Sequence, residues 1–434
     1  MTADWQDKTW GDIATLEYGK GLREYSGTSG QFPVFGTNGQ IGWYKEALYE
    51  GPSVIVGRKG AYRGIQYSET PFFVIDTAFY LKPKITFDMK WAYYELLTRD
   101  INSMDSGSAI PSTNRDEFHS LHVRIPPLPE QRRIALILGT LDDKIENNRK
   151  TAKTLEAMAQ AIFKSWFVDF DPVRAKMSGE SRESIRKRLK VTPEILDLFP
   201  DRLVDSELGE IPEGWEVKPL GELVNIIKGR SYKSDELSDS ETALVTLKSF
   251  ARGGGYRVDG LKPFTGTYKP EQLLNSGDML IACTDVTQAA EVIGRPIIIR
   301  KNAKYHNLVA SLDTIIVRPM HPSLNSTFLY YLCATDLFVG HTSTYVTGTT
   351  VLHLGKEAIL SFRFAFATHK LVEIFQITAL PLLKQIDIFE TESEHLMSLR
   401  DILLPKLISG EIRVPDRNLI VGDSIGGIHK DRLS

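Results

Sequence analysis

Residues 129–167, PEQRRIALILGTLDDKIENNRKTAKTLEAMAQAIFKSWF, carry the pattern that decides the fold of this chain. Apolar residues recur there at alternating steps of three and four, at Ile134, Ile137, Leu141, Ile145, Ala152, Leu155, Ala159, Ile162 and Trp166. This heptad spacing predicts a long amphipathic helix whose seam packs on a partner helix. Pro129 suits a first helical position. At about 1.5 Å per residue the helix would be about 60 Å long, which is a length typical of a spacer.

One place in this seam is polar, because Asn148 occupies it. We expect a polar seam residue to help fix the register of the helix packing. A merely solvated asparagine is the alternative.

The composition bounds the class of protein. The chain has 434 residues of ordinary globular composition, enough for two or three domains. No apolar run reaches the length of a membrane span, and the first residues, MTADWQDKTW, lack a signal pattern. The two cysteines, Cys283 and Cys333, have no metal-site spacing and indicate a reducing, cytoplasmic location. The net charge of −3 argues against coating nucleic acid by bulk charge but leaves room for local basic faces.

The N-terminal stretch of the chain is repeated in its second half. WQDKTWGDIATLEYGKGL begins at Trp5, and WEVKPLGELVNIIKGRSY begins at Trp215. At this one offset the pairs Trp5/Trp215, Lys8/Lys218, Gly11/Gly221 and Gly19/Gly229 are identical. Such a set is hard to obtain by chance, so the sequence predicts an internal repeat.

The helical pattern also returns, over residues 368–407. The aligned seam pairs are Ile134/Phe375, Leu141/Leu382, Ile145/Ile386, Leu155/Leu396, Ile162/Leu403 and Trp166/Leu407, whereas Asn148 aligns with Phe389. Pro381 and Pro405 fall inside the second pattern, where we expect them to kink the helix or mark its ends. Two helices with one seam each are most simply explained by packing on each other.

These repeats predict an α+β fold class: two mixed α/β domains separated by two long antiparallel helices, a coiled-coil spacer with a pseudo-two-fold internal repeat. Strand-like runs are 53–56, 72–75, 279–282, 296–299 and 314–317, and helical runs are 91–97, 180–190 and 327–333. The expected boundaries are a first globular domain at 1–128, a first helix at 129–168, a connector at 169–214, a second domain at 215–366, a second helix at 367–413 and a flexible tail at 414–434.

Catalytic motifs are missing from the sequence. No phosphate-binding loop, dinucleotide fingerprint or amino-methyltransferase motif occurs. Asp201 with Glu216 and Lys218 loosely fits a metal-dependent nuclease pattern, but the first repeat has no carboxylate matching Glu216. His119 and His122 could be a metal pair, although surface histidines are the better interpretation.

Residues suited to DNA gather on loops of the first domain. The glycine-bounded loop GRKGAYRG begins at Gly57 after a predicted strand, and it can bring bidentate donors and an aromatic ring to bases or phosphates. A second candidate loop follows Gly36. A tight turn with solvated charges is the alternative. The candidate DNA-binding residues of this domain are Lys20, Thr37, Asn38, Tyr44, Lys45, Arg58, Lys59, Tyr62 and Arg63.

The second domain has its own basic, glycine-rich and aromatic stretches. The loop after the predicted strand 279–282 takes the place of the Arg58 loop and carries short polar side chains that could read bases or could simply form a turn. The candidate DNA-binding residues here are Lys228, Arg230, Tyr232, Lys233, Lys248, Arg252, Tyr256, Arg257, Thr284 and Gln288.

Four motifs carry a family likeness. SAIPSTN at 108–114, IPPLPEQ at 125–131, LEAMAQAIFKSWFVDFDP at 155–172 and LPKLISGEIRV at 404–414 resemble the specificity subunit of type I restriction–modification systems. The likeness covers essentially the whole chain, and its helical motifs are the specific part.

The resemblance implies two target-recognition domains that each read half of a split double-stranded DNA site, with the helices setting the gap. It implies partners, two methyltransferase subunits and restriction subunits, which would bind S-adenosylmethionine, ATP and Mg²⁺. No cofactor and no catalytic residue is expected on this chain, and no membrane partner. Two alternatives remain: a self-sufficient DNA nuclease or methyltransferase with a disguised site, and a coiled-coil scaffold that binds protein.

Overall fold

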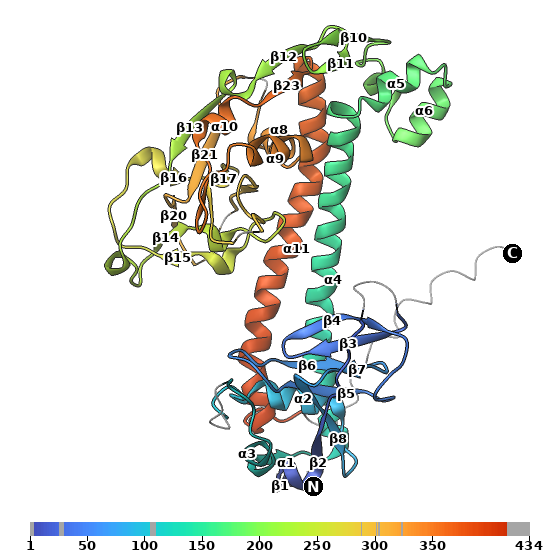
Figure 1. Ribbon diagram of the computed structural model, residues 1–434, viewed down its shortest axis with the longest axis vertical. Helices are drawn as coiled ribbons and strands as arrows, with labels where there is room; N and C mark the ends of the chain where they lie inside the picture. Colours follow the sequence, from blue (N-terminus) through green and yellow to red (C-terminus); the bar gives the residue numbers. More distant parts are fainter. Residues whose placement is uncertain are drawn as a thin grey trace, which may run out of the picture. The chain divides into compact units, whose positions relative to one another are not determined.

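The computed structural model describes residues 4–25, 30–104, 110–287, 289–300, 302, 304–322 and 324–414. The chain forms two compact units, one made of Met1–Asn148 with Thr391–Ser434 and the other of Arg149–Glu390. Two long helices, α4 (Leu128–Phe167) and α11 (His369–Ser409), pass through both units (Figure 1). Each unit therefore contains one globular domain and one part of each helix.

The predicted seam of α4 is buried or half-buried along its whole length. Ile134, Ile145, Ala152, Ala159 and Trp166 are each at most 5% exposed. The second predicted helix is also continuous, and Pro381 and Pro405 lie inside it, so the expectation that they mark its ends is wrong. Both prolines are on the exposed face, where water can bond to the carbonyl that each proline leaves without an amide partner.

The two helices are antiparallel within each unit. In the first unit, Ile134 and Leu138 of α4 share a core with Leu407 and Ile408 near the end of α11. In the second unit, Trp166 near the end of α4 lies against Phe375 near the start of α11, with ring centroids 6.3 Å apart. The early part of one helix thus meets the late part of the other, as the repeat predicts.

The described residues of the first globular domain form three small sheets. Their strand orders are β2-β8-β5-β6, β4-β3-β7 and β1-β9. The strands are β1 (Gln6–Thr9), β2 (Ala14–Tyr18), β3 (Phe32–Gly36), β4 (Gly39–Tyr44), β5 (Ser53–Gly57), β6 (Ile65–Ser68), β7 (Phe73–Val74), β8 (Ala78–Pro83) and β9 (His122–Ile125). The helices are α1 (Trp10–Ile13), α2 (Met89–Leu97) and α3 (Arg115–Ser120).

The second globular domain repeats this plan with longer connections. Its main sheets are β13-β21-β17-β19, β15-β14-β20-β16 and β12-β23. The strands are β12 (Glu216–Pro219), β13 (Val224–Lys228), β14 (Thr242–Val245), β15 (Lys262–Pro263), β16 (Leu273–Leu274), β17 (Met279–Ala282), β18 (Thr284–Asp285), β19 (Pro296–Ile298), β20 (Asn307–Ala310), β21 (Thr314–Pro319), β22 (Leu352–His353) and β23 (Arg363–Phe366). The helices are α8 (Ser326–Cys333), α9 (Asp336–Ser343) and α10 (Lys356–Leu360), with short 3-10 turns between strands.

The repeated glycines have the same structural cause in both domains. A Cβ atom on Gly19 would lie 2.0 Å from the carbonyl oxygen of Ile75, and one on Gly229 would lie 2.0 Å from that of Ser311. The amides of these glycines donate to Ala78 and Thr314, at the starts of β8 and β21. Close backbone approach at the same edge of the same sheet therefore explains the repeat that is visible in the sequence.

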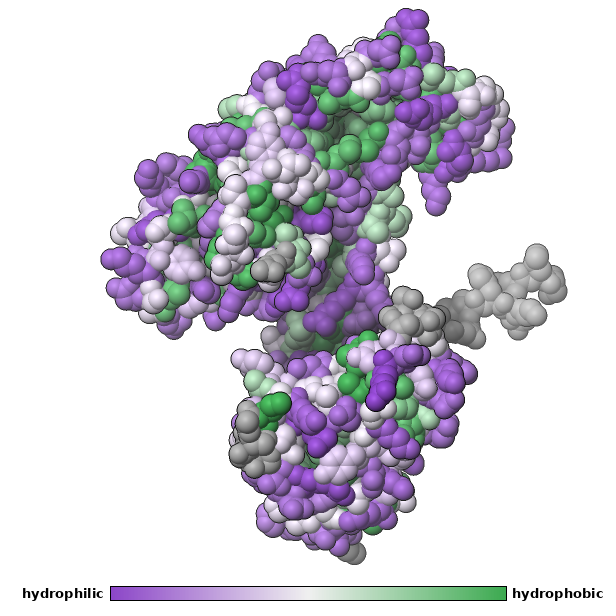
Figure 2. All heavy atoms as spheres, viewed as in Figure 1, coloured by the Kyte–Doolittle hydropathy of each residue, from purple (hydrophilic) through white to green (hydrophobic). Residues whose placement is uncertain are grey.

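The connector between the repeats belongs to the second unit. It forms α5 (Asp171–Met177), α6 (Arg182–Leu189), α7 (Pro193–Leu196) and a hairpin of β10 (Leu203–Ser206) and β11 (Gly209–Pro212). The surface of the α5–α6 segment is largely hydrophilic (Figure 2), because only Ile185 of α6 is buried.

Candidate nucleic-acid interface

The loop of residues 58–64 joins β5 to β6 and is held by backbone hydrogen bonds. The Arg58 amide donates to the carbonyl oxygen of Thr77 at 2.9 Å, and the Thr113 amide donates to that of Arg58 at 2.8 Å. At the far end, Gly57 donates to Gly64 at 2.8 Å. These bonds fix where the loop begins and ends.

The loop of residues 283–295 joins β17 to β19 and is held in the same way. The Cys283 amide donates to Asp313 at 2.8 Å, and the Leu354 amide donates to Cys283 at 2.8 Å. The Ala282 amide donates to Arg295 at 3.2 Å. Arg58 and Cys283 are therefore structural equivalents, and the two loops occupy equivalent places, as the sequence predicts.

The first loop presents cationic and aromatic side chains. The Arg58 guanidinium carbon lies 4.9 Å from the ring centroid of Tyr18, and its Nη1 donates to the Asp76 carbonyl oxygen at 2.9 Å. Lys59 lies 3.8 Å from the Asp76 carboxylate, with its side chain 41% exposed. Tyr62 is 82% exposed at the tip of the loop. Side chains of these types contact phosphates and base edges in protein–DNA complexes.

Arg63 was expected to face DNA, and the structure places it differently. Only 4% of this residue is exposed, and its Nη2 donates to the carbonyl oxygens of Ile101 and Asn102 at 3.1 and 2.8 Å. Main-chain carbonyls of residues 101 and 102, far from the loop in sequence, thus hold the Arg63 guanidinium in the interior of the domain. Arg63 supports the loop from beneath and presents no donor at the surface.

Thr37 and Asn38 lie next to the loop, and Thr37 has a supporting role. The Thr37 hydroxyl donates to the carbonyl oxygens of Lys59 at 2.9 Å and Thr77 at 3.0 Å. Asn38 is exposed, and its Oδ1 lies 3.2 Å from where a Cβ on Gly64 would be. The turn before β4 and the β5–β6 loop therefore form one surface.

The other candidates of the first domain are more scattered. Lys20 is exposed, and its amide donates to Val74 at 2.9 Å. Tyr44 packs on Phe73, and Lys45 pairs with Glu46 at 3.4 Å. Tyr44 and Lys45 are at the far end of β4 from Asn38, roughly 20 Å along an extended strand. Their role in binding stays a prediction.

The second loop is organised around a buried carboxylate. Asp285 is 3% exposed and accepts hydrogen bonds from the Thr287 amide and hydroxyl at 2.8 Å and from the Val292 amide at 2.9 Å. Burial raises the pKa of Asp285, but these hydrogen bonds outweigh it and the net shift is downward. Thr284 is 9% exposed and donates to Asp313, so it supports the loop. Gln288 lies outside the described residues.

The arginines of the second domain are held by carboxylates. Arg257 pairs with Asp259 through Nε at 3.1 Å and Nη2 at 2.5 Å, and this contact lowers the pKa of Asp259. Arg252 lies 3.3 Å from Glu291, at the base of the loop. Arg230 bonds the Thr267 carbonyl oxygen and Glu236. Fixed carboxylates of this kind weaken non-specific attraction to phosphates.

The remaining candidates of this domain vary in exposure. Lys228, Lys233 and Lys248 are exposed, whereas Tyr232 and Tyr256 are half-buried. The Lys262 ammonium lies 5.6 Å from the ring centroid of Tyr232. Tyr256 packs on the core beneath β14 and β17.

The suspected nuclease and metal residues have structural partners. Asp201 pairs with Lys176 at 3.0 Å, and Glu216 pairs with Lys218 at 3.0 Å. His119 accepts a hydrogen bond from the Leu16 amide at 3.2 Å. Within the described ranges, no three His, Cys, Asp or Glu side chains are grouped so as to hold a metal ion. Among the helices that the structure describes, none combines the length and apolarity needed to cross a membrane.

The comparisons with known proteins agree with this architecture. A sequence model of the type I restriction modification DNA specificity domain matches residues 2–157 and 212–367. The chain is 26% identical over 342 residues to the type I restriction enzyme HindI specificity subunit of Haemophilus influenzae, covering 70% of this chain and 71% of that protein. It is 24% identical over 341 residues to the MjaIX specificity subunit of Methanocaldococcus jannaschii, covering 77% and 71%.

A solved structure shares the fold. The S subunit of a type I restriction–modification system from M. genitalium superposes with a TM-score of 0.56 at 16% identity, covering 93% of this chain and 96% of that one. Two matches to the family domain account for most of the sequence, and the first match runs into α4 whereas the second ends just before α11 begins. The chain therefore belongs to the type I restriction–modification DNA specificity family, as a non-catalytic subunit that recognises a DNA target.

Proposed function

We propose that the chain reads a bipartite double-stranded DNA site, one half with each globular domain. One observation carries this proposal: the two loops are pinned by equivalent backbone bonds but present unrelated side chains. Arg58, Lys59 and Tyr62 are carried by one loop, whereas the other has Val286 exposed and Thr284 and Asp285 turned inward. Two loops with equivalent backbone anchors and different side chains suit two domains that recognise different base sequences.

The helices supply the gap between the half-sites. A continuous helix of 40 residues, such as α4, spans about 60 Å at about 1.5 Å per residue. Because α4 and α11 pack on each other in both units, they are stiffer than a single helix. The spacer length is then set by the number of helical residues.

The chemistry belongs to partners in this proposal. Two methyltransferase subunits would bind S-adenosylmethionine and methylate adenine, and restriction subunits would use ATP and Mg²⁺ to translocate and cleave DNA. The complex would act in the cytoplasm, on double-stranded DNA. The net charge of −3 and the paired arginines favour weak DNA binding by the chain alone, with the methyltransferase subunits completing the grip.

Methylome mapping tests this proposal. The chain is co-expressed with its methyltransferase partner in a host that lacks other adenine methylation, and methylated adenines are mapped across the genome. We expect a split motif with two fixed half-sites and one gap length. A continuous motif, or methylation without a motif, would contradict the proposal.

Two arginines of the same loop give a sharper test. Arg58→Ala removes a half-buried guanidinium at the loop surface and is expected to weaken methylation through the first half-site by about 1–3 kcal/mol, with the second half-site unchanged. Arg63→Ala removes a buried support and is expected to lower the Tm of the chain. Equal effects of Arg58→Ala on both half-sites would contradict the assignment of this loop to one half.

A further inference from the structure

In the first unit, a tyrosine of the globular domain bonds to a carboxylate of the long helix. Tyr94 on α2 is fully buried, and its hydroxyl donates to Asp142 Oδ2 of α4 at 2.7 Å. From α11, Arg400 Nη1 donates to the other oxygen of the same carboxylate at 2.9 Å. Asp142 therefore joins the domain and both helices at one point.

The second unit has a corresponding arrangement. The helix equivalent to α2 is α8, and its Tyr330 and Tyr331 donate to the two carboxylate oxygens of Glu156 on α4 at 3.0 and 3.3 Å. The link to α11 comes from the domain itself, because Arg300 pairs with Asp387 at 2.9 Å and also with Glu390. A carboxylate of α4 again receives tyrosine hydroxyls from the globular domain.

These contacts restrict the angle between domain and helix more sharply than the apolar packing around them does. The hydrophobic effect has little directional preference, so a small rotation of a domain about an apolar helix face costs little free energy. Hydrogen bonds to an ionised carboxylate are directional and stronger than neutral ones. Burial raises the pKa of Tyr94, Tyr330 and Tyr331, so these hydroxyls stay protonated donors at neutral pH.

We propose that Asp142 and Glu156 are positioning residues that fix the rotation of each recognition domain about the helices, and so the phase at which the two half-sites are read. This inference rests on the proposed bipartite recognition. B-DNA turns by about 35° per base pair, given about 10–10.5 base pairs per turn. A spacer one base pair too long is therefore mainly a rotational error, and rigid tyrosine–carboxylate contacts would reject it.

Removal of a single hydroxyl tests the proposal. Tyr94→Phe keeps the ring and the packing, and the pair Tyr330→Phe with Tyr331→Phe does the same in the second unit. Each variant is assembled with the methyltransferase partner, and methylated motifs are mapped. We expect unchanged half-sites, with the fraction of sites whose gap is one base pair longer or shorter rising by about tenfold.

Tyr49→Phe is the matched control, because its ring packs on Phe72 and Tyr80 within the first domain. This variant should keep one gap length. If the Tyr94 and Tyr330/Tyr331 variants keep the wild-type gap, or lose methylation equally at all sites, the contacts are merely structural and the proposal is wrong. If the wild-type complex gives no split motif, the proposed function itself fails, and the two failures are thus distinguished.

Discussion

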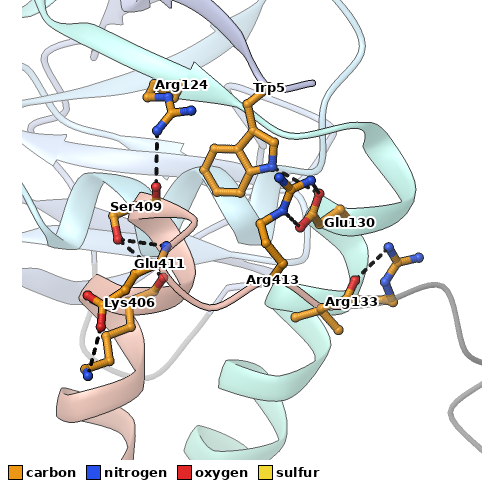
Figure 3. A network of polar contacts seen from close by, with 9 residues as sticks. Trp5, Arg124, Glu130, Arg133, Lys406, Ser409, Glu411 and Arg413 are labelled. Carbon is orange, nitrogen blue, oxygen red and sulfur yellow. Dashed lines mark hydrogen bonds and ion pairs between the residues drawn. The ribbon is translucent and has the colours of Figure 1, made fainter. Parts of the chain in front are cut away.

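Arg413 forms a two-pronged ion pair with Glu130, across most of the length of the chain. Its Nε lies 2.7 Å from Oε1 and its Nη2 lies 2.8 Å from Oε2 (Figure 3). Trp5 Nε1 donates to the same carboxylate at 3.0 Å, and the Arg413 guanidinium lies over the Trp5 ring. The segment after α11 is thereby tied to the first turn of α4 and to the residue just before β1.

This ion pair predicts a pH-dependent contribution to stability. Burial raises the pKa of Glu130, but hydrogen bonds from Arg413 and Trp5 outweigh it, and the pKa lies below its ordinary value of 4.5. A carboxyl group whose pKa is lower in the folded state than in the unfolded state stabilises the fold when the pH is above its unfolded-state pKa. This stabilisation is lost as the pH falls through its folded-state pKa. Arg413→Ala should therefore lower the Tm at pH 7. The difference in Tm between this variant and the wild type should shrink as the pH falls below 4.5.

Thermal melting of the purified wild type and variant over a pH series measures this difference in Tm. Arg23→Ala, an exposed arginine of the same unit, is the control and should leave the Tm unchanged. A difference in Tm that is independent of pH would contradict the assignment to Glu130.

A second prediction concerns the polar place in the helix seam. Asn148 is 1% exposed, so the solvated alternative is wrong, and its Nδ2 donates to Glu392 Oε2 of α11 at 2.8 Å. Lys144 also pairs with Glu392 at 3.1 Å. A buried polar seam residue costs stability in exchange for register, so Asn148→Leu should raise the Tm. Asn147→Leu on the exposed face is the control; a lower Tm for Asn148→Leu would refute the idea.

The repeated glycines give a third prediction. Gly19→Ala and Gly229→Ala each force a methyl group against a backbone carbonyl at 2.0 Å, and backbone cannot shift cheaply. Each variant should destabilise its unit by about 1–3 kcal/mol or more. Gly21→Ala, where no atom lies within 4 Å of the new methyl group, should be neutral. Denaturant melts provide the free energies of unfolding, and equal values for Gly19→Ala and Gly21→Ala would contradict the steric account.

A fourth prediction concerns the carboxylates that hold the arginines of the second domain. Asp259→Asn keeps the shape but releases Arg257, so binding to non-specific DNA should tighten and its salt dependence should steepen by about one charge. Glu271→Gln removes one charge from a looser pair with Lys269, 3.9 Å apart, and serves as the control. Equal gains for both variants would show that net charge alone matters.

The long helices were predictable because the spacing of their apolar residues in the sequence matches the period of helix packing. The start of α4 lies one residue and the start of α11 two residues from the expected boundaries, since each buried position of the seam needs an apolar side chain. The strands after which the loops begin, β5 and β17, were also found from short apolar runs. The expectation that Pro381 and Pro405 mark the ends of the second helix failed. A helix tolerates proline on its exposed face, and a single sequence does not show which face is exposed.

The direction of side chains within the loops was not predictable. Arg58 and Arg63 lie in one loop of similar residues, yet Arg58 stays half-buried beside Tyr18 and Asp76, whereas Arg63 is buried on the carbonyls of residues 101 and 102. Asp285 is one of the short polar side chains that could read bases or form a turn, and it holds the loop together. Such choices depend on partners brought in by the tertiary fold, and nothing in the local sequence records them.

The anchoring of the two loops has a consequence for how this chain can evolve. Thr77, Thr113 and their counterparts Asp313 and Leu354 hold Arg58 and Cys283 through main-chain atoms alone. Substitutions at exposed positions of these loops, such as Tyr62 and Val286, therefore leave the scaffold bonds intact, whereas Arg63 and Asp285 are needed to hold their loops. Under the proposed function, one scaffold would carry different DNA specificities through exchange of such exposed side chains, and each half-site would diversify without disturbing the other.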